Sequence, residues 1–270
     1  MGRGLAANLA RIFGMRAMSR VGRLVLPQRC LLCGAPCNRR GGSGESSCDI
    51  MSHDPICAGC DAAHWNEPRL RCRLCALPLA LRGAGSHDEA RYLCADCTRV
   101  RPPFDRTLTL ADYRAPLEQL ALNLKFGGRL LIAREFAQRL ARVALDNFAP
   151  DERPDVLAPV PLAHARLVER GFNQAWEIAK PLARWLALPA DATLMRRHAY
   201  TAPQSRLDLD ARRRNVEGAF GVMRPVRGAH IALVDDVMTS GATLAAAARA
   251  LKAAGARQVT NFVALRTPKD

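Results

Sequence analysis

Residues 230–256 join a short apolar run, two aspartates, a loop of small residues and an alanine-rich helical pattern: HIALVDDVMTSGATLAAAARALKAAGA. The run Ile231–Val234 is typical of a buried strand, so Asp235 and Asp236 are predicted at its carboxyl end. Open α/β sheets bind their ligands at that end of their strands. The segment therefore predicts a strand–loop–helix unit of an α/β sheet, with a ligand site at the turn.

The same alternation of patterns continues through residues 101–270, after the breaker sequence RPPFD. Strand patterns cover residues 107–114, 154–162, 230–237 and 258–266, and helical patterns cover residues 116–126, 129–145, 171–188 and 243–256. Strands that alternate with helices predict a mostly parallel sheet. We therefore expect an α/β fold for residues 101–270, and we expect Trp176 and Trp185 of the third helix in its core.

The ten cysteines of the 270-residue chain all precede this domain, and eight of them form four Cys-x-x-Cys pairs. Two such pairs supply the four thiolates of a tetrahedral Zn²⁺ site. Pairing in chain order gives two sites, although crossed pairing and metal-free, reduced or redox-active pairs stay open from the spacing alone. The candidate metal ligands are Cys30, Cys33, Cys57, Cys60, Cys72, Cys75, Cys94 and Cys97.

Residues 30–100 hold too few apolar residues for a core of their own, so structural zinc is expected to supply their folding energy. Cys37 and Cys48 fall outside the pairs and are interpreted as spare, although Cys37 could replace a ligand. Regular pairing without a secretory signal favours the reducing cytoplasm over a secreted disulfide framework. Residues 1–29 form a basic lead-in, and no apolar run approaches the ~20 residues that a membrane span needs.

The charge of the chain favours anionic partners. The formal net charge is +15, which suits nucleic acid or phosphorylated small molecules. The 40 basic residues comprise 36 arginines and 4 lysines in an alanine-rich chain, a ratio that a bias of genomic base composition also explains. The charge therefore permits an anionic partner without identifying one.

The loop after the two aspartates has the features of a phosphate site. Free backbone N–H groups and the positive end of the following helix attract an anion, and Gly241 lets the backbone approach it closely. Carboxylates repel phosphate, so Asp235 and Asp236 are expected to face hydroxyl groups or a divalent cation. A ribose 5-phosphate satisfies both requirements. The candidate loop consists of Val237, Met238, Thr239, Ser240, Gly241, Ala242 and Thr243.

The sequence DDVMTSGAT closely resembles the phosphoribosyl-pyrophosphate (PRPP) loop of type I phosphoribosyltransferases. The segments PVPL (159–162), RGFNQA (170–175) and ARRRNVEGAF (211–220), together with Gln204 and with Lys125 in LNLKFGG, resemble the ComF/GntX group of phosphoribosyltransferase-like proteins. That resemblance covers residues 28–268. It implies a sheet of the type I phosphoribosyltransferase kind, preceded by a double zinc ribbon at residues 30–100.

The resemblance also implies roles for individual residues. Asp235 and Asp236 would hold the ribose hydroxyls, and one of them could serve as a base. Arg170 and Lys125 would hold the pyrophosphate of a PRPP–Mg²⁺ complex. The family's pyrophosphate loop corresponds to Val160, Pro161 and Leu162. A ligand contact and a helix-cap or loop hydrogen bond stay open for Asn173, Gln174, Gln204 and Asn215.

Two functions follow from the resemblance. The first is transfer of a phosphoribosyl group from PRPP to an unknown acceptor, which would make the chain a type I phosphoribosyltransferase. The alternative is a non-catalytic protein that handles single-stranded DNA in natural competence and DNA uptake. The expected partners are PRPP or a related ribose 5-phosphate ligand, single-stranded DNA and further copies of the same chain.

Overall fold

A computed structural model describes residues 29–36, 55–65, 70–79, 92–198 and 218–269. The chain divides into two compact units, Met1–Ala63 and His64–Asp270. The first two Cys-x-x-Cys pairs belong to the first unit, and the other two belong to the second. An independently folding α/β domain that begins at residue 101 stays a prediction. Four residues named above lie outside the described residues: Cys37, Cys48, Gln204 and Asn215.

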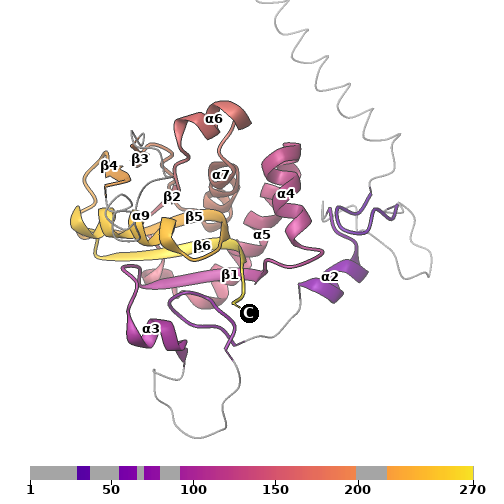
Figure 1. Cartoon of the computed structure of the whole chain (residues 1–270), viewed down its shortest axis with the longest axis horizontal. Helices are drawn as coiled ribbons and strands as arrows, with labels where there is room; N and C mark the ends of the chain where they lie inside the picture. Colours follow the sequence, from indigo (N-terminus) through magenta and orange to yellow (C-terminus); the bar gives the residue numbers. More distant parts are fainter. Residues whose placement is uncertain (1–28, 37–54, 66–69, 80–91, 199–217, 270) are drawn as a thin grey trace, which may run out of the picture. The chain divides into compact units, whose positions relative to one another are not determined.

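Four parallel strands form the main sheet of the second unit, in the spatial order β1-β6-β5-β2 (Figure 1). Residues 231–234 of β5 and 262–265 of β6, the two central strands, are fully buried. Continuous apolar runs of this kind are typical of parallel strands that helices cover on both faces. The strands are β1 (Arg106–Asp112), β2 (Val156–Pro159), β5 (His230–Met238) and β6 (Gln258–Arg266).

The longer helices pack on this sheet in two groups. α5 (Leu130–Asn147) and α7 (Gln174–Leu186) contact each other and the sheet, whereas α9 (Ala242–Ala253) contacts β4, β5 and β6. None of the helices among the described residues is both long and apolar enough to cross a bilayer. The other elements are α2 (Ala58–His64), α3 (Ala95–Arg99), α4 (Glu118–Gly127), η2 (Pro150–Glu152), α6 (His164–Arg170), β3 (Met195–Arg197) and β4 (Phe220–Val222), the last two forming a separate antiparallel pair.

The predicted α/β class and parallel sheet are confirmed, because each expected strand and helix between residues 101 and 270 is present. The structure adds α6 and the β3–β4 pair, which no sequence pattern had indicated. The expectation for Trp185 is wrong, since this side chain is 52% exposed. It lies on the outer face of α7, since Leu182, Ala183 and Leu186 of the same turn are buried. Trp176 is only partly buried.

Candidate functional site

Asp235 and Asp236 lie within β5 rather than at its end. The strand continues for two more residues, which pair with Leu265 and Arg266 of β6. This corrects the end of the strand that the apolar run had indicated. Successive side chains of a strand point to opposite sides, so the two carboxylates have different surroundings. Asp236 is buried, whereas Asp235 is partly exposed.

Lys125 in the last turn of α4 forms an ion pair with Asp236. The distance between Lys125 Nζ and Asp236 Oδ2 is 3.1 Å. No ion pair of Asp235 occurs among the described residues, although the charge of Lys125 acts on its carboxyl group as well. Asp235 Oδ1 accepts the backbone N–H of Asp236 at 2.9 Å. Although part of Asp235 is open to solvent, the protein around its carboxyl group withdraws it from water. This desolvation, and then the negative charge of Asp236, raise the pKa of Asp235 well above its ordinary value. Asp235 is therefore the carboxylate that would gain most from a hydroxyl donor or a cation.

The loop that follows β5 is shaped by Gly241, the N-cap residue of α9. Its φ of 81° lies in the left-handed region that glycine favours. A Cβ atom here would come within 2.5 Å of Met238 Cε. Ser240 Oγ accepts the Ala242 N–H at 3.3 Å, and the side chains of Thr239 and Ser240 are exposed. The loop thus presents hydroxyl groups and the positive end of α9 to solvent, which suits a phosphate.

The predicted pyrophosphate loop begins beside β5. The Val160 N–H donates to the Val234 carbonyl at 2.9 Å, which places the start of residues 160–162 next to Asp235. Asn173 fixes this loop, because its Nδ2 donates to the Val160 carbonyl at 3.0 Å. Asn173 Oδ1 also accepts the Ala175 N–H at 3.0 Å and so caps α7. The structure thus gives Asn173 a capping and bracing role.

Arg170 reaches the same region from the last turn of α6. Its guanidinium carbon lies 5.4 Å from the ring centre of Phe126, the neighbour of Lys125. Arg170 Nε is buried and has no hydrogen-bond partner among the described residues. Arg170 thus lies beside the residue that follows Lys125, the partner of Asp236.

Each unit holds one group of four thiols that could bind a metal. The four Sγ atoms of each group lie within 4.8 Å of one another, and the grouping follows chain order. None of the eight described cysteines forms a disulfide. The Cys57 N–H donates to Cys30 Sγ at 3.3 Å. Hydrogen bonds from the Cys75 side chain and from backbone N–H groups lower the pKa of Cys72 to about 4. Burial raises the pKa of Cys57, Cys60 and Cys97, and the neighbouring Cys72 side chain raises that of Cys75, so without a metal the thiols of a group do not ionise together. Four thiols this close to one another match the donor set of structural zinc.

The two thiol groups are built alike. In each, an arginine and a proline that flank a Cys-x-x-Cys turn form a β-bridge. The arginine also donates across its turn through Nη1. In the first group Arg29 donates to the Gly34 carbonyl at 3.0 Å, and in the second Arg71 donates to the Ala76 carbonyl at 3.1 Å. The residue after the turn has a positive φ in both, 70° at Gly34 and 57° at Ala76. The corresponding sequences are RCLLCGAP (29–36) and RCRLCALP (71–78). We call these turns the first and the second knuckle.

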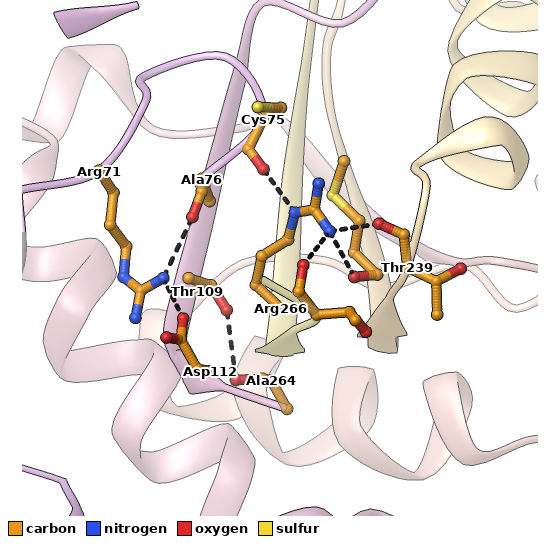
Figure 2. A network of polar contacts seen from close by, with 10 residues as sticks. Arg71, Cys75, Ala76, Thr109, Asp112, Thr239, Ala264 and Arg266 are labelled. Atoms are coloured by element: carbon orange, nitrogen blue, oxygen red, sulfur yellow. Dashed lines mark hydrogen bonds and ion pairs between the residues drawn. The ribbon is translucent and has the colours of Figure 1, made fainter. Parts of the chain in front are cut away.

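The second knuckle is tied to the ends of two neighbouring strands (Figure 2). Arg71 Nη1 lies 2.8 Å from Oδ1 of Asp112, the last residue of β1. Arg266, the last residue of β6 and the register partner of Asp112, donates through Nε to the Cys75 carbonyl at 2.8 Å. Cys72, Cys75 and other residues of the knuckle also belong to the core of the second unit. This thiol group is therefore part of the α/β unit.

The sequence has full-length relatives among characterised proteins, although no family model matches it. DNA utilization protein YhgH of Escherichia coli K12 is 34% identical over 250 residues, which cover 90% of this chain and 99% of the relative. Competence protein ComFC of Bacillus subtilis is 30% identical over 226 residues, 81% of this chain and 87% of the relative. The chain belongs to the ComF/GntX family. Competence protein F of Haemophilus influenzae is 32% identical over 173 residues, 62% of this chain and 75% of the relative.

Solved structures resemble this ComF/GntX chain over about half its length. Purine phosphoribosyltransferase from Pyrococcus horikoshii is 16% identical, with a TM-score of 0.31, over 49% of this chain and 83% of that chain. An allosteric regulatory enzyme of purine biosynthesis is 20% identical, with a TM-score of 0.33, over 48% of this chain and 25% of that chain. Similarities of this size concern the fold alone.

Sequence patterns did not identify Arg71 and Arg266 of this ComF/GntX chain. For Arg71 a signal existed, because the shared pattern R-C-x-L-C-x-x-P makes its arginine part of both knuckles. Arg266 had none, since an arginine that ends a strand usually faces solvent. Its 2% exposure and its partners appear only in the folded chain.

Proposed function

We propose that the chain binds PRPP, or a related ribose 5-phosphate ligand, together with Mg²⁺ beside β5. The 5-phosphate would occupy residues 237–243, and the ribose hydroxyls would donate to Asp235 and Asp236. Lys125, Arg170 and residues 160–162 would hold the pyrophosphate. The Lys125–Asp236 ion pair carries this proposal, because it joins a cation suited to pyrophosphate to the carboxylate pair suited to ribose.

The same residues suit a phosphoribosyl transfer. Pyrophosphate would leave C1′ of the ribose with the electrons of the C1′–O bond, while the acceptor supplies the electrons of the new bond. Positive charge develops on the ribose ring in such a transition state, and the carboxylates of Asp235 and Asp236 would stabilise it. Mg²⁺ would neutralise the pyrophosphate as it leaves. The acceptor stays unassigned.

A thermal-shift experiment with the full chain tests ligand binding. At a hundredfold excess of PRPP–Mg²⁺ over Kd, linkage gives roughly 2.7 kcal/mol, or roughly 5–10 °C in Tm for a chain of this size. The Asp235→Asn/Asp236→Asn variant should fold and lose the shift. An equal shift in that variant would remove both carboxylates from the site. Pyrophosphate release against a panel of bases then tests for catalysis.

We also propose that each thiol group binds one structural Zn²⁺. The compact grouping of four sulfur atoms at each site supports this, and so does the N–H of Cys57, which donates to Cys30 Sγ. In a closed tetrahedral site the metal would cross-link two Cys-x-x-Cys turns and stabilise a small module.

Single-stranded DNA is the second candidate ligand, since relatives are named for DNA utilization and for competence. A groove of about 390 Å³ beside the second knuckle is lined by Arg71, Arg73, Arg106 and the exposed Tyr92, among others. Burial, and then the charge of Arg73, lower the pKa of Arg106. A phosphate between these two arginines would relieve their repulsion.

Salt dependence tests the DNA proposal. If arginine–phosphate contacts dominate, affinity for a single-stranded oligonucleotide should fall with a log–log slope of about −0.7 per phosphate neutralised. The Arg73→Gln/Arg106→Gln variant should have a shallower slope than the wild type. The matched control is Arg249→Gln/Arg257→Gln, which removes the same charge elsewhere in the second unit. Equal slopes in the two variants would exclude the groove.

A further inference from the structure

Arg266 links the phosphate loop directly to the second knuckle (Figure 2). Its Nη1 donates to the carbonyls of Met238 at 2.9 Å, Thr267 at 2.7 Å and Thr239. Its Nε donates to the Cys75 carbonyl at 2.8 Å. One side chain thus contacts both the first part of the loop and a cysteine of the candidate metal site.

The link is stiff for two reasons. A guanidinium is planar, so donors on Nε and Nη1 keep fixed relative directions. The side chain is 2% exposed, and a buried carbonyl that loses its donor costs more than the same loss in water. A shift of the Cys75 backbone would therefore move Arg266 or break its bonds to Met238 and Thr239.

We propose that Arg266 is a positioning residue that couples the second thiol site to the phosphate loop. Metal at Cys72, Cys75, Cys94 and Cys97 holds the knuckle and, through Arg266, the loop in its phosphate-binding shape. Phosphate in the loop in turn raises the metal affinity of the second site, because coupling between two sites is reciprocal in binding free energy. Phosphate stabilises the metal-bound knuckle, so that metal leaves it more slowly. The ligand half of this inference rests on the proposed PRPP site, whereas the Arg266–knuckle half does not.

The first knuckle is an internal control. It has the same arginine–proline bridge and the same turn, and it supplies two thiols of the first group. Among the described residues, no arginine donates to the Cys33 carbonyl, the counterpart of the Cys75 carbonyl. A metal at the first site should therefore respond to neither Arg266 nor a ligand in the loop.

The test measures zinc release from the zinc-loaded full chain with a chromogenic chelator that leaves Mg²⁺ on PRPP. The Cys30→Ser/Cys33→Ser variant, which lacks the first site, identifies the phase that belongs to the second. Saturating PRPP–Mg²⁺ should slow release from the second site about fivefold or more, the lower end of typical coupling, and leave the first unchanged. Equal slowing at both sites, or at neither, would overturn the coupling.

An Arg266→Lys variant tests the link without any ligand. Lysine keeps the charge but is a point donor that cannot span both sets of carbonyls. Zinc release from the second site should be several-fold faster than in the wild type, with release from the first site unchanged. Equal rates in variant and wild type at the second site would overturn the proposal.

These experiments also distinguish failure of the proposed PRPP site from failure of the coupling through Arg266. If PRPP–Mg²⁺ gives no thermal shift in the wild type, the proposed ligand is wrong, and Arg266→Lys alone decides the link to the knuckle. If PRPP–Mg²⁺ does bind, its Kd should rise in Arg266→Lys, and PRPP should no longer slow release from the second site. Weaker binding with the slowing intact would overturn the coupling, because it would indicate general destabilisation.

Discussion

Asp235 and Asp236 are adjacent in β5, yet the fold treats their charges differently. Asp236 is buried against Lys125, whereas Asp235 accepts a backbone N–H and has a raised pKa caused by burial and by its neighbour. A carboxylate whose charged form the fold disfavours has a cost that a ligand can offset, and such groups gather at functional sites. We therefore assign the main contact with ligand hydroxyls to Asp235.

Asp235→Asn is expected to stabilise the unliganded chain and to abolish the PRPP-dependent shift. A carboxyl whose pKa is raised by folding stabilises the fold below its unfolded pKa of about 3.9, and this stabilisation is lost as pH rises through the folded pKa. Asparagine keeps the hydrogen-bond acceptor and has no charge to bury. The gain in Tm, a few degrees at neutral pH, should shrink toward acid pH.

Thermal melts of the wild type and of Asp235→Asn across the pH range measure this difference in Tm. The matched control is Asp146→Asn, which changes an exposed aspartate of α5. A variant less stable than the wild type at neutral pH would contradict the assigned environment of Asp235.

At the scale of elements, the turn from β5 into α9 decides the shape of the phosphate site. At Gly241 a positive φ coincides with a Cβ position 2.5 Å from the end of the Met238 side chain, so any other residue would strain the backbone and displace that side chain. Gly228 has a similar φ of 74° but open space around it, and it lies before the opposite end of β5. Substitutions at these two glycines therefore distinguish the effect of backbone strain from the effect of a changed binding site.

Gly241→Val should abolish PRPP binding, whereas Gly228→Val should retain it. Both substitutions place an L side chain in the left-handed region, at a cost of about 1–2 kcal/mol. Calorimetry with PRPP–Mg²⁺, after melts that match the two variants in stability, measures the difference. Affinity for single-stranded DNA should stay nearly intact in both. Loss of both ligands in Gly241→Val would mean that the loop itself holds the DNA phosphate.

The elements of the sheet were predictable because their apolar patterns are local. Contiguous apolar runs, such as residues 231–234, mark buried strands, and the loop motif follows directly in the chain. The β3–β4 pair was missed because its strands have three residues each, too few for a pattern. The Lys125–Asp236 pair and the Arg266–Cys75 bond, 191 residues apart, depend on tertiary packing that no local pattern encodes.

At the scale of the whole molecule, the two thiol groups belong to different units. Cys72, Cys75 and Cys97 are buried in the same core as the sheet, so the second site and the α/β unit share their stability. None of the described cysteines of the first site belongs to that core. Duplicated knuckles can therefore have different roles, one within its own unit and one in support of the ligand site.

Loss of the two sites should have unequal effects on the α/β unit. Wild-type chain should contain two zinc ions, one for each thiol group, and less than one per chain would contradict the zinc proposal. Cys72→Ser/Cys75→Ser should lower the Tm of the main transition strongly, because a structural zinc site contributes about 10–16 kcal/mol of apparent binding energy. Cys30→Ser/Cys33→Ser should leave it nearly unchanged. Metal analysis and calorimetric melts check both variants.

The most direct test of the account is a calorimetric titration of the zinc-loaded full chain with PRPP and Mg²⁺. We expect saturable binding of one PRPP per chain that requires Mg²⁺, survives Gly228→Val and is lost in Asp235→Asn/Asp236→Asn. Absence of binding in the wild type, or equal binding in the double aspartate variant, would contradict the assignment of a ribose 5-phosphate site to β5 and its loop.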